Sequence, residues 1–168
     1  MWKRLLVGVV LSGALVSILY VLYPSRTILE IAGAQTGRAI WCAEMAEDEE
    51  FVLSFVHSVN RRPVYDTLRA AGDHLIIVKS RFDAFGAGMP ETSTQDGKLA
   101  VGPDGWLEWT VNRPVPEVVV RVGRVANHSL RVKGRETALA DLAEPGTPLA
   151  LRVRAASVFG IWKGKCIW

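Results

Sequence analysis

The sequence predicts an all-β fold, a sandwich or partly closed barrel of about 8–10 short strands, preceded by one N-terminal transmembrane helix. Three observations lead to this fold class. After residue 26 the chain consists of short segments with alternating apolar and polar residues, most of them separated by Gly, Pro or Asn turns. Strands that alternate with long helical segments are missing from the pattern, which argues against a doubly wound sheet. The chain begins with one uninterrupted apolar run.

The apolar run covers residues 5–23 and contains no charged side chain. As a helix it is just long enough to cross a hydrocarbon core of roughly 30 Å. Lys3 and Arg4 precede it, so the positive-inside rule keeps the N-terminus in the cytoplasm. We therefore expect residues 1–26 to be a single-pass anchor in the inner (cytoplasmic) membrane. Residues 27–168 would form a β domain on the periplasmic or extracellular side.

A cleaved signal peptide is the alternative interpretation of the N-terminus. Its apolar core is usually about 7–15 residues long and is followed by small residues. Here the run is longer and ends in Tyr23-Pro24-Ser25-Arg26. Cleavage would release the domain as a secreted protein, so both interpretations place it outside the cytoplasm.

The charge distribution gives no sign of nucleic-acid binding. The chain has 20 basic and 17 acidic residues. Without Lys3, Arg4 and Arg26, which flank the apolar run, the two numbers are equal. The basic character therefore belongs to the N-terminal flank, and we expect no nucleic-acid partner.

The two cysteines, Cys42 and Cys166, lie near opposite ends of the expected β domain. In an oxidising compartment two such thiols commonly form a disulfide. Two buried free thiols are the alternative, because cysteine is among the most buried residue types. No further ligand stands at metal-binding spacing from either cysteine, so a metal site is not expected.

Alternation and turn residues predict the strands of the domain. The expected strands cover residues 27–32, 38–44, 51–58, 64–70, 74–82, 99–101, 106–110, 115–122, 129–132 and 149–155. Residues 83–98 are one long irregular loop, and residues 135–143 permit one or two helical turns before Pro145-Gly146.

A possible site combines His57 with Asp66. If the strands 51–58 and 64–70 form a hairpin, the two residues lie on neighbouring strands and on the same face. The carboxylate would then orient the imidazole or raise its pKa. A purely structural hydrogen bond at the end of the hairpin is the favoured interpretation of this pair. Ser58 points to the opposite face, so it is a poor nucleophile for His57. We therefore expect no catalytic residues, no cofactor and no metal, and a hydrolase is the least favoured class.

The loop segment Phe85-Gly86-Ala87-Gly88-Met89-Pro90 is the second candidate. Its backbone could form a nest for an anion, or the glycines could serve only a wide turn with positive φ. Together the candidate binding residues are His57, Ser58, Pro63, Asp66, Phe85, Gly86, Gly88 and Pro90.

Several of these segments resemble a family called domain of unknown function 1850. They are Phe51–Val59, Pro63–Asp66, Arg81-Phe82, Phe85–Pro90 and Asp104-Gly105-Trp106. Where the family often has Glu after Pro-Val, this chain has Asp66, and the cysteine pair is not part of the motif. The resemblance implies a small exported or anchored protein associated with TAXI-type tripartite ATP-independent periplasmic (TRAP) transporters, and no known chemistry.

The resemblance and the residues lead to two functional expectations. The first is a non-catalytic, membrane-anchored extracytoplasmic accessory protein of a TRAP system, which contacts the membrane through residues 5–23 and the transporter's membrane subunit or solute receptor. The second is a binding module for a small carboxylate or a metal ion, with His57, Asp66 and the 85–90 loop at the site.

Overall fold

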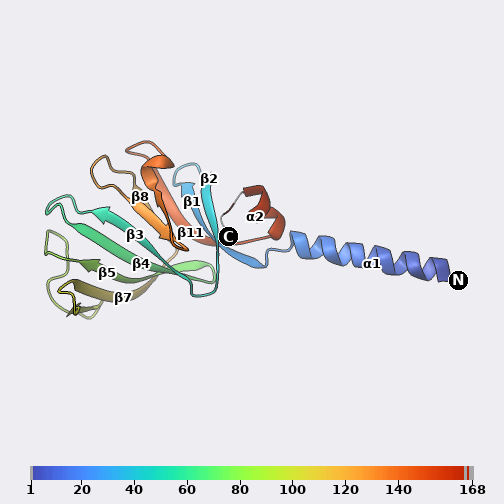
Figure 1. Cartoon of the computed structure of the whole chain (residues 1–168), viewed down its shortest axis with the longest axis horizontal. Helices are drawn as coiled ribbons and strands as arrows, with labels where there is room; N and C mark the ends of the chain where they lie inside the picture. The colour runs from blue at the N-terminus through green and yellow to red at the C-terminus, as the bar shows by residue number, and fades with distance from the viewer. Residues whose placement is uncertain (1, 165, 167–168) are drawn as a thin grey trace.

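The computed structural model describes residues 2–164 and 166, and its strands form two antiparallel β-sheets (Figure 1). The four-stranded sheet has the order β2-β1-β11-β8, and the seven-stranded sheet has the order β10-β9-β3-β4-β5-β7-β6. The all-β prediction is therefore confirmed, and two sheets that share one core agree with a sandwich.

The strands are β1 (Arg26–Gly33), β2 (Ala39–Met45), β3 (Glu50–Val56), β4 (Pro63–Ala71), β5 (His74–Phe82), β6 (Lys98–Val101), β7 (Leu107–Val115), β8 (Glu117–Arg121), β9 (Ser129–Val132), β10 (Arg135–Ala138) and β11 (Pro148–Ala156). The helices are α1 (Trp2–Leu22), the short 3-10 helix η1 (Leu139–Asp141) and α2 (Val158–Gly164).

The expectation of helical turns over residues 135–143 is only partly correct. Residues Arg135–Ala138 form β10, which pairs with β9, and only Leu139–Asp141 are helical. Lys133 and Gly134 connect the two strands with φ of 50° and 73°. Two consecutive positive φ values are typical of a tight hairpin turn, and this turn directs the following residues into the sheet.

The core lies between the two sheets and is built from alternating residues. Leu29 and Ile31 of β1 and Leu151 of β11 are fully buried from one side, and Phe51 and Leu53 of β3 meet them from the other. Because successive strand residues point to opposite faces, the neighbours Ile28 and Glu30 face outward.

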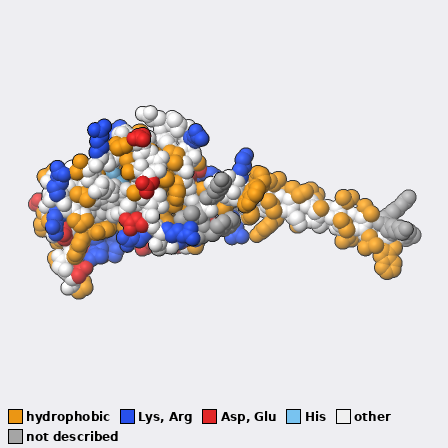
Figure 2. Space-filling view, turned by 45° about the horizontal axis from the view of Figure 1, so that its top comes forward, with side chains coloured by type: hydrophobic (Ala, Val, Ile, Leu, Met, Phe, Trp, Pro, Cys, Tyr) orange, Lys and Arg blue, Asp and Glu red, His pale blue; other side chains and the backbone are white. Residues whose placement is uncertain are grey.

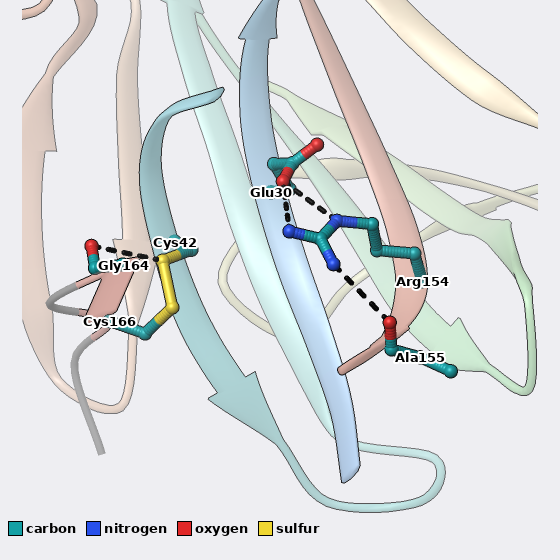
Figure 3. The surroundings of a disulfide bond; sticks show 6 residues. All are labelled: Glu30, Cys42, Arg154, Ala155, Gly164 and Cys166. Carbon is teal, nitrogen blue, oxygen red and sulfur yellow. Dashed lines mark hydrogen bonds and ion pairs between the residues drawn. A yellow bond between two sulfur atoms is a disulfide. The ribbon is translucent and has the colours of Figure 1, made fainter. Parts of the chain in front are cut away.

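A second, smaller apolar cluster covers the outer face of the four-stranded sheet. Ile161 of α2 packs there with Ile28, Ala156 and the half-cystines Cys42 and Cys166. Cys42 and Cys166 form the predicted disulfide, which ties the end of the chain to β2 (Figure 3).

Helix α1 extends away from the sheets, with exposed apolar side chains from Leu6 to Leu22 (Figures 1 and 2). Among the described residues, no helix combines the length and the apolarity that crossing a membrane requires, which does not support the transmembrane helix expected over residues 5–23.

Candidate functional site

A cavity of about 400 Å³ lies on the inner face of the seven-stranded sheet, beneath the loop 83–97. Strands β4, β5 and β7 form its floor, and the loop contributes Gly88, Met89 and Pro90 to its wall. The complete lining consists of Val64, Asp66, Ile77, Ser80, Gly88, Met89, Pro90, Thr94, Asp96, Trp109, Val111 and Arg113.

Strand register brings the polar and aromatic parts of the floor together. Asp66 of β4 pairs with Ser80 of β5, and Ser80 pairs with Trp109 of β7. Residues directly opposite in neighbouring strands point to the same face. Asp66 is also opposite Leu53 of β3, a core residue, so this row faces the inside of the sandwich.

Alternation along β7 places Arg113 on the same face as Trp109 and Val111, and all three side chains line the cavity. Ile77 of β5 pairs with Arg113 across the strands. Between the pairs Ile77–Arg113 and Lys79–Thr110, β7 has one more residue than β5, and Asn112 in this interval has a φ of 51°. This irregularity is a β-bulge.

The loop 83–97 is held in place near both of its ends. The side-chain amide of Asn60 donates hydrogen bonds to the carbonyl oxygens of Ala84 and Phe85, at 3.3 and 3.1 Å. Gly97 lies so close to the indole of Trp109 that a Cβ atom would be 2.6 Å from its Cζ2. Glycine is therefore required where the loop crosses Trp109.

Asp66 is a carboxyl group of the cavity whose pKa is shifted by its surroundings. Burial raises the pKa of its carboxyl group, and the hydrogen bond from the Ser80 hydroxyl, at 2.5 Å, lowers it in part. The net effect is a pKa above the ordinary value. Asp66 is thus more readily protonated than a surface aspartate, and in that form it can donate a hydrogen bond.

The Asp66→Asn variant should be more stable than the wild type at pH 7. Because the folded-state pKa of Asp66 is raised, ionisation destabilises the fold as pH increases through that pKa. Asparagine keeps an oxygen for the Ser80 hydroxyl and cannot ionise. The advantage should disappear below about pH 3.9, the ordinary aspartate pKa. Urea unfolding from pH 3 to pH 8 measures it, and an advantage that is constant over this range would contradict the assignment.

Arg113 and Asp96 give the cavity charges of both signs. Both side chains are exposed, and neither forms an ion pair with any residue that the structure describes. Nearby charges elsewhere in the sheet are paired: Lys79 with Glu108, and Arg81 with Asp104.

The structure separates the predicted site residues into two groups. Asp66, Gly88 and Pro90 line the cavity, whereas His57, Ser58, Pro63, Phe85 and Gly86 do not. Pro63 is the first residue of β4, and Phe85 packs edge-on against the buried Phe82, with ring centroids 6.3 Å apart. Gly86 lies between Asn60 and His57, where a Cβ atom would be 2.8 Å from the Asn60 amide nitrogen.

The expected contact between His57 and Asp66 is not formed. The hairpin of β3 and β4 exists as predicted, but β3 ends at Val56, so His57 belongs to the turn. Its Nδ1 accepts the backbone N–H of Val59 at 3.3 Å, while Asp66 is bonded to Ser80. Ser58 lies in the same turn and lines a different, mainly apolar cavity with Arg61 and Arg124.

Three residues of this site were not among the sequence candidates. Ser80 and Trp109 join Asp66 only through the pairing of three strands, and Arg113 joins because β7 extends to Val115. The mixed apolar and polar sequence of residues 107–115 was the available signal, because a strand with Trp and Arg on one face does not belong to a sealed core.

Such a cavity can hold a small organic molecule. Trp109, Val111 and Ile77 offer apolar surface, and Asp66, Ser80 and Arg113 offer hydrogen bonds. Within the described part of the chain, no three His, Cys, Asp or Glu side chains gather as they would around a metal ion.

A comparison with known protein families matches the part of the chain that forms the cavity. No curated protein and no solved structure matches the sequence. A family model described as "Domain of unknown function (DUF1850)" matches residues 51–139, just over half of the chain, and this stretch contains every residue that lines the cavity. The chain belongs to the DUF1850 family.

Proposed function

We propose that this protein is a non-catalytic, extracytoplasmic binding module that holds a small organic ligand in the cavity around Asp66. One observation carries the proposal: a single cavity combines apolar walls, hydrogen-bonding groups and a loop fixed near both ends. Ligand sites are usually preformed concave surfaces of this kind, with a few polar groups that orient the ligand.

The dimensions of the cavity support a small ligand. Its volume of about 400 Å³ lies in the lower part of the range for small-molecule sites, about 300–1,000 Å³. A larger hollow of about 610 Å³ lies along α1, but its lining residues, from Val16 to Pro24, include no charged side chain. Asp66 makes the smaller cavity the better candidate, because a mostly buried carboxyl with a raised pKa is typical of functional sites.

Replacing Val111 with Phe should abolish ligand binding without unfolding the protein. Val111 lines the cavity and is partly exposed, so the larger ring fills the space that a ligand needs. The measurement is a nuclear magnetic resonance screen of the purified full chain with a library of small acids, amines, amides and sugars. At least one compound should shift the amide signals of Met89, Thr94 and Trp109 in the wild type and not in Val111→Phe.

Val119→Phe is the matched control. Val119 is an exposed residue of β8 in the other sheet, and its substitution should leave binding unchanged. A library in which no compound shifts the signals of the cavity, or in which Val111→Phe binds as the wild type does, would contradict the proposal.

An extracytoplasmic location is part of the same proposal. It is supported by the Cys42–Cys166 disulfide, which is typical of oxidising compartments, and by the basic flank before the apolar residues 5–23. In this proposal residues 5–23 direct the chain to the membrane for export. Protection of both cysteines from thiol reagents in intact cells tests the location, and free cytoplasmic thiols would refute it.

An accessory role in TRAP transport is the second candidate function, and it rests on what the sequence resemblance to the family implies. In this role the β domain contacts the membrane subunit or the solute receptor of a transporter, and the ligand cavity serves that partner. Purification of the tagged chain from native membranes in mild detergent tests the contact. Transporter subunits should co-purify with it, and purification of the chain alone would remove this candidate.

A further inference from the structure

We propose that the ligand is a small monocarboxylate with an apolar body, whose carboxylate pairs with Arg113 while its body lies against Trp109. This inference rests on the proposed function of the cavity and specifies the chemical class of its ligand. Three features of the lining support it: an unpaired guanidinium, an adjacent apolar wall, and two acidic residues that restrict the number of negative charges.

Arg113 provides the site for the carboxylate. It lines the cavity beside Val111, and it has no acidic partner within ion-pair distance among the residues that the structure describes. A planar guanidinium binds a carboxylate through two parallel hydrogen bonds, so it recognises this group better than a point charge does. Because no ion pair of Arg113 within the described residues has to be broken first, a ligand carboxylate can bind its guanidinium directly.

The apolar body of the ligand follows from the side chains next to Arg113. Ile77 pairs with Arg113 across the strands, and Val111 and Trp109 precede it along β7. Met89 and Pro90 face this wall from the loop. A chain or ring placed between these two walls removes apolar surface from water on both sides, which favours the complex.

The acidic residues explain why one carboxylate fits and two do not. Asp66 and Asp96 line the cavity together with Arg113, and these three are the titratable side chains of its lining. A second ligand carboxylate would lie near one of them without a second cation to balance it. Like charges at such distances repel, and the repulsion is stronger where the site excludes water.

Asp66 also makes binding depend on pH. When protonated, it removes one negative charge from the cavity and can donate a hydrogen bond to a ligand oxygen. Burial raises the pKa of Asp66, so its protonation begins at a higher pH than that of an ordinary surface aspartate. Affinity for a monocarboxylate should therefore rise as pH falls from 8 towards the raised pKa of Asp66, and the Asp66→Asn variant should lose most of this dependence.

Three related probes test the charge requirement with the purified full chain at one pH: hexanoate, its neutral analogue hexanamide, and the dicarboxylate adipate. Hexanoate should shift the amide signals of the cavity at the lowest concentration. Hexanamide should bind at least about tenfold more weakly because it lacks the charge that pairs with Arg113. Adipate should do the same because its second carboxylate would lie near Asp66 or Asp96 without a cation to balance it.

Substitution of Arg113 shows whether this residue is responsible. Arg113→Gln should weaken hexanoate binding about tenfold or more and leave hexanamide binding unchanged. Arg113→Lys, which keeps the charge but loses the planar fork, should recover part of the affinity. Arg135→Gln is the matched control, because Arg135 is exposed on β10 at the other edge of the same sheet.

The outcomes separate this inference from the proposed function. Equal binding of hexanoate and hexanamide, stronger binding of adipate, or unchanged binding by Arg113→Gln would overturn the monocarboxylate assignment. If none of the three probes binds but other library compounds shift the cavity signals, the ligand class is wrong and the binding function remains. If the library also yields no compound for the cavity, the proposed function fails as well.

Discussion

Replacing Cys42 and Cys166 with alanine should lower the free energy of unfolding by about 2–4 kcal/mol. The disulfide joins residues separated by 124 positions, and without it the unfolded chain gains the conformational freedom of almost the whole β domain. The variant also releases α2, whose Ile161 packs beside the half-cystines on the outer face of the four-stranded sheet. Guanidinium unfolding of both proteins under oxidising conditions measures the difference.

Chemical reduction provides the control for this prediction. Dithiothreitol should destabilise the wild type by a similar amount and should have no effect on the double alanine variant. A loss smaller than about 0.5 kcal/mol, which is ordinary for a surface substitution, would show that the bond contributes little to the fold.

The second large effect is expected at Glu30, which is 2% exposed on the outer face of β1. Its carboxylate accepts hydrogen bonds from two guanidinium groups on the paired strand β11. Arg152 donates at 2.7 and 3.0 Å, and Arg154 donates at 2.7 Å, the contact drawn in Figure 3. Glu30→Gln removes the charge between two cations. It should destabilise the protein by about 2–3 kcal/mol, less than for a fully buried group, because both arginines remain partly solvated.

The dependence on pH identifies the cause of this loss. Burial raises the pKa of Glu30, but the hydrogen bonds and charges of Arg154 and Arg152 lower it more, so its folded-state pKa is below the ordinary value. The stabilisation is therefore present above the unfolded-state pKa and disappears as pH falls through the folded-state pKa. In urea unfolding, wild type and variant should converge at low pH.

Glu44→Gln is the comparison for Glu30. Glu44 lies on β2 and pairs at 3.3 Å with Arg26, whose side chain is 45% exposed. An ion pair of this kind contributes at most about 1 kcal/mol, so the substitution should change stability by less than that. Equal losses for Glu30→Gln and Glu44→Gln would contradict the special role of the buried carboxylate.

Local patterns in the sequence were sufficient for most of the β domain. The alternation of residues 51–58 and 64–70 predicted the β3–β4 hairpin, and the strands at 74–82 and 129–132 have the expected bounds. Phe51, Leu53 and Phe55 recur at every second position, so the period of two is clear in the first of these segments. The short C-terminal helix α2 has no comparable pattern, and it forms because Ile161 and the disulfide dock it on the sheet.

The site was only partly predictable because it depends on contacts between distant segments. Asp66 and the glycine-rich loop were expected at one site, and the structure brings Gly88 and Pro90 to the cavity that Asp66 lines. The expected role of His57 assumed that β3 continues to residue 58. The strand ends two residues earlier, and the turn that follows takes His57 out of the row that Asp66 occupies.

Arg113 shows a different limit of sequence reasoning. The strand expected over residues 106–110 ended before Arg113, whereas β7 continues to Val115, and alternation with Trp109 and Val111 then places Arg113 on the cavity face. Asn112 and Pro114 are typical turn residues and indicated a break, but both lie within the strand, where Asn112 adopts a φ of 51°.

A crystal structure of the full chain with hexanoate tests the central claim most directly. Our account predicts electron density for the ligand between Met89 and Trp109, with its carboxylate within hydrogen-bonding distance of the Arg113 guanidinium. Density for hexanoate elsewhere on the protein, or a cavity closed by the side chains of the 83–97 loop, would contradict the assignment of this cavity as the ligand site.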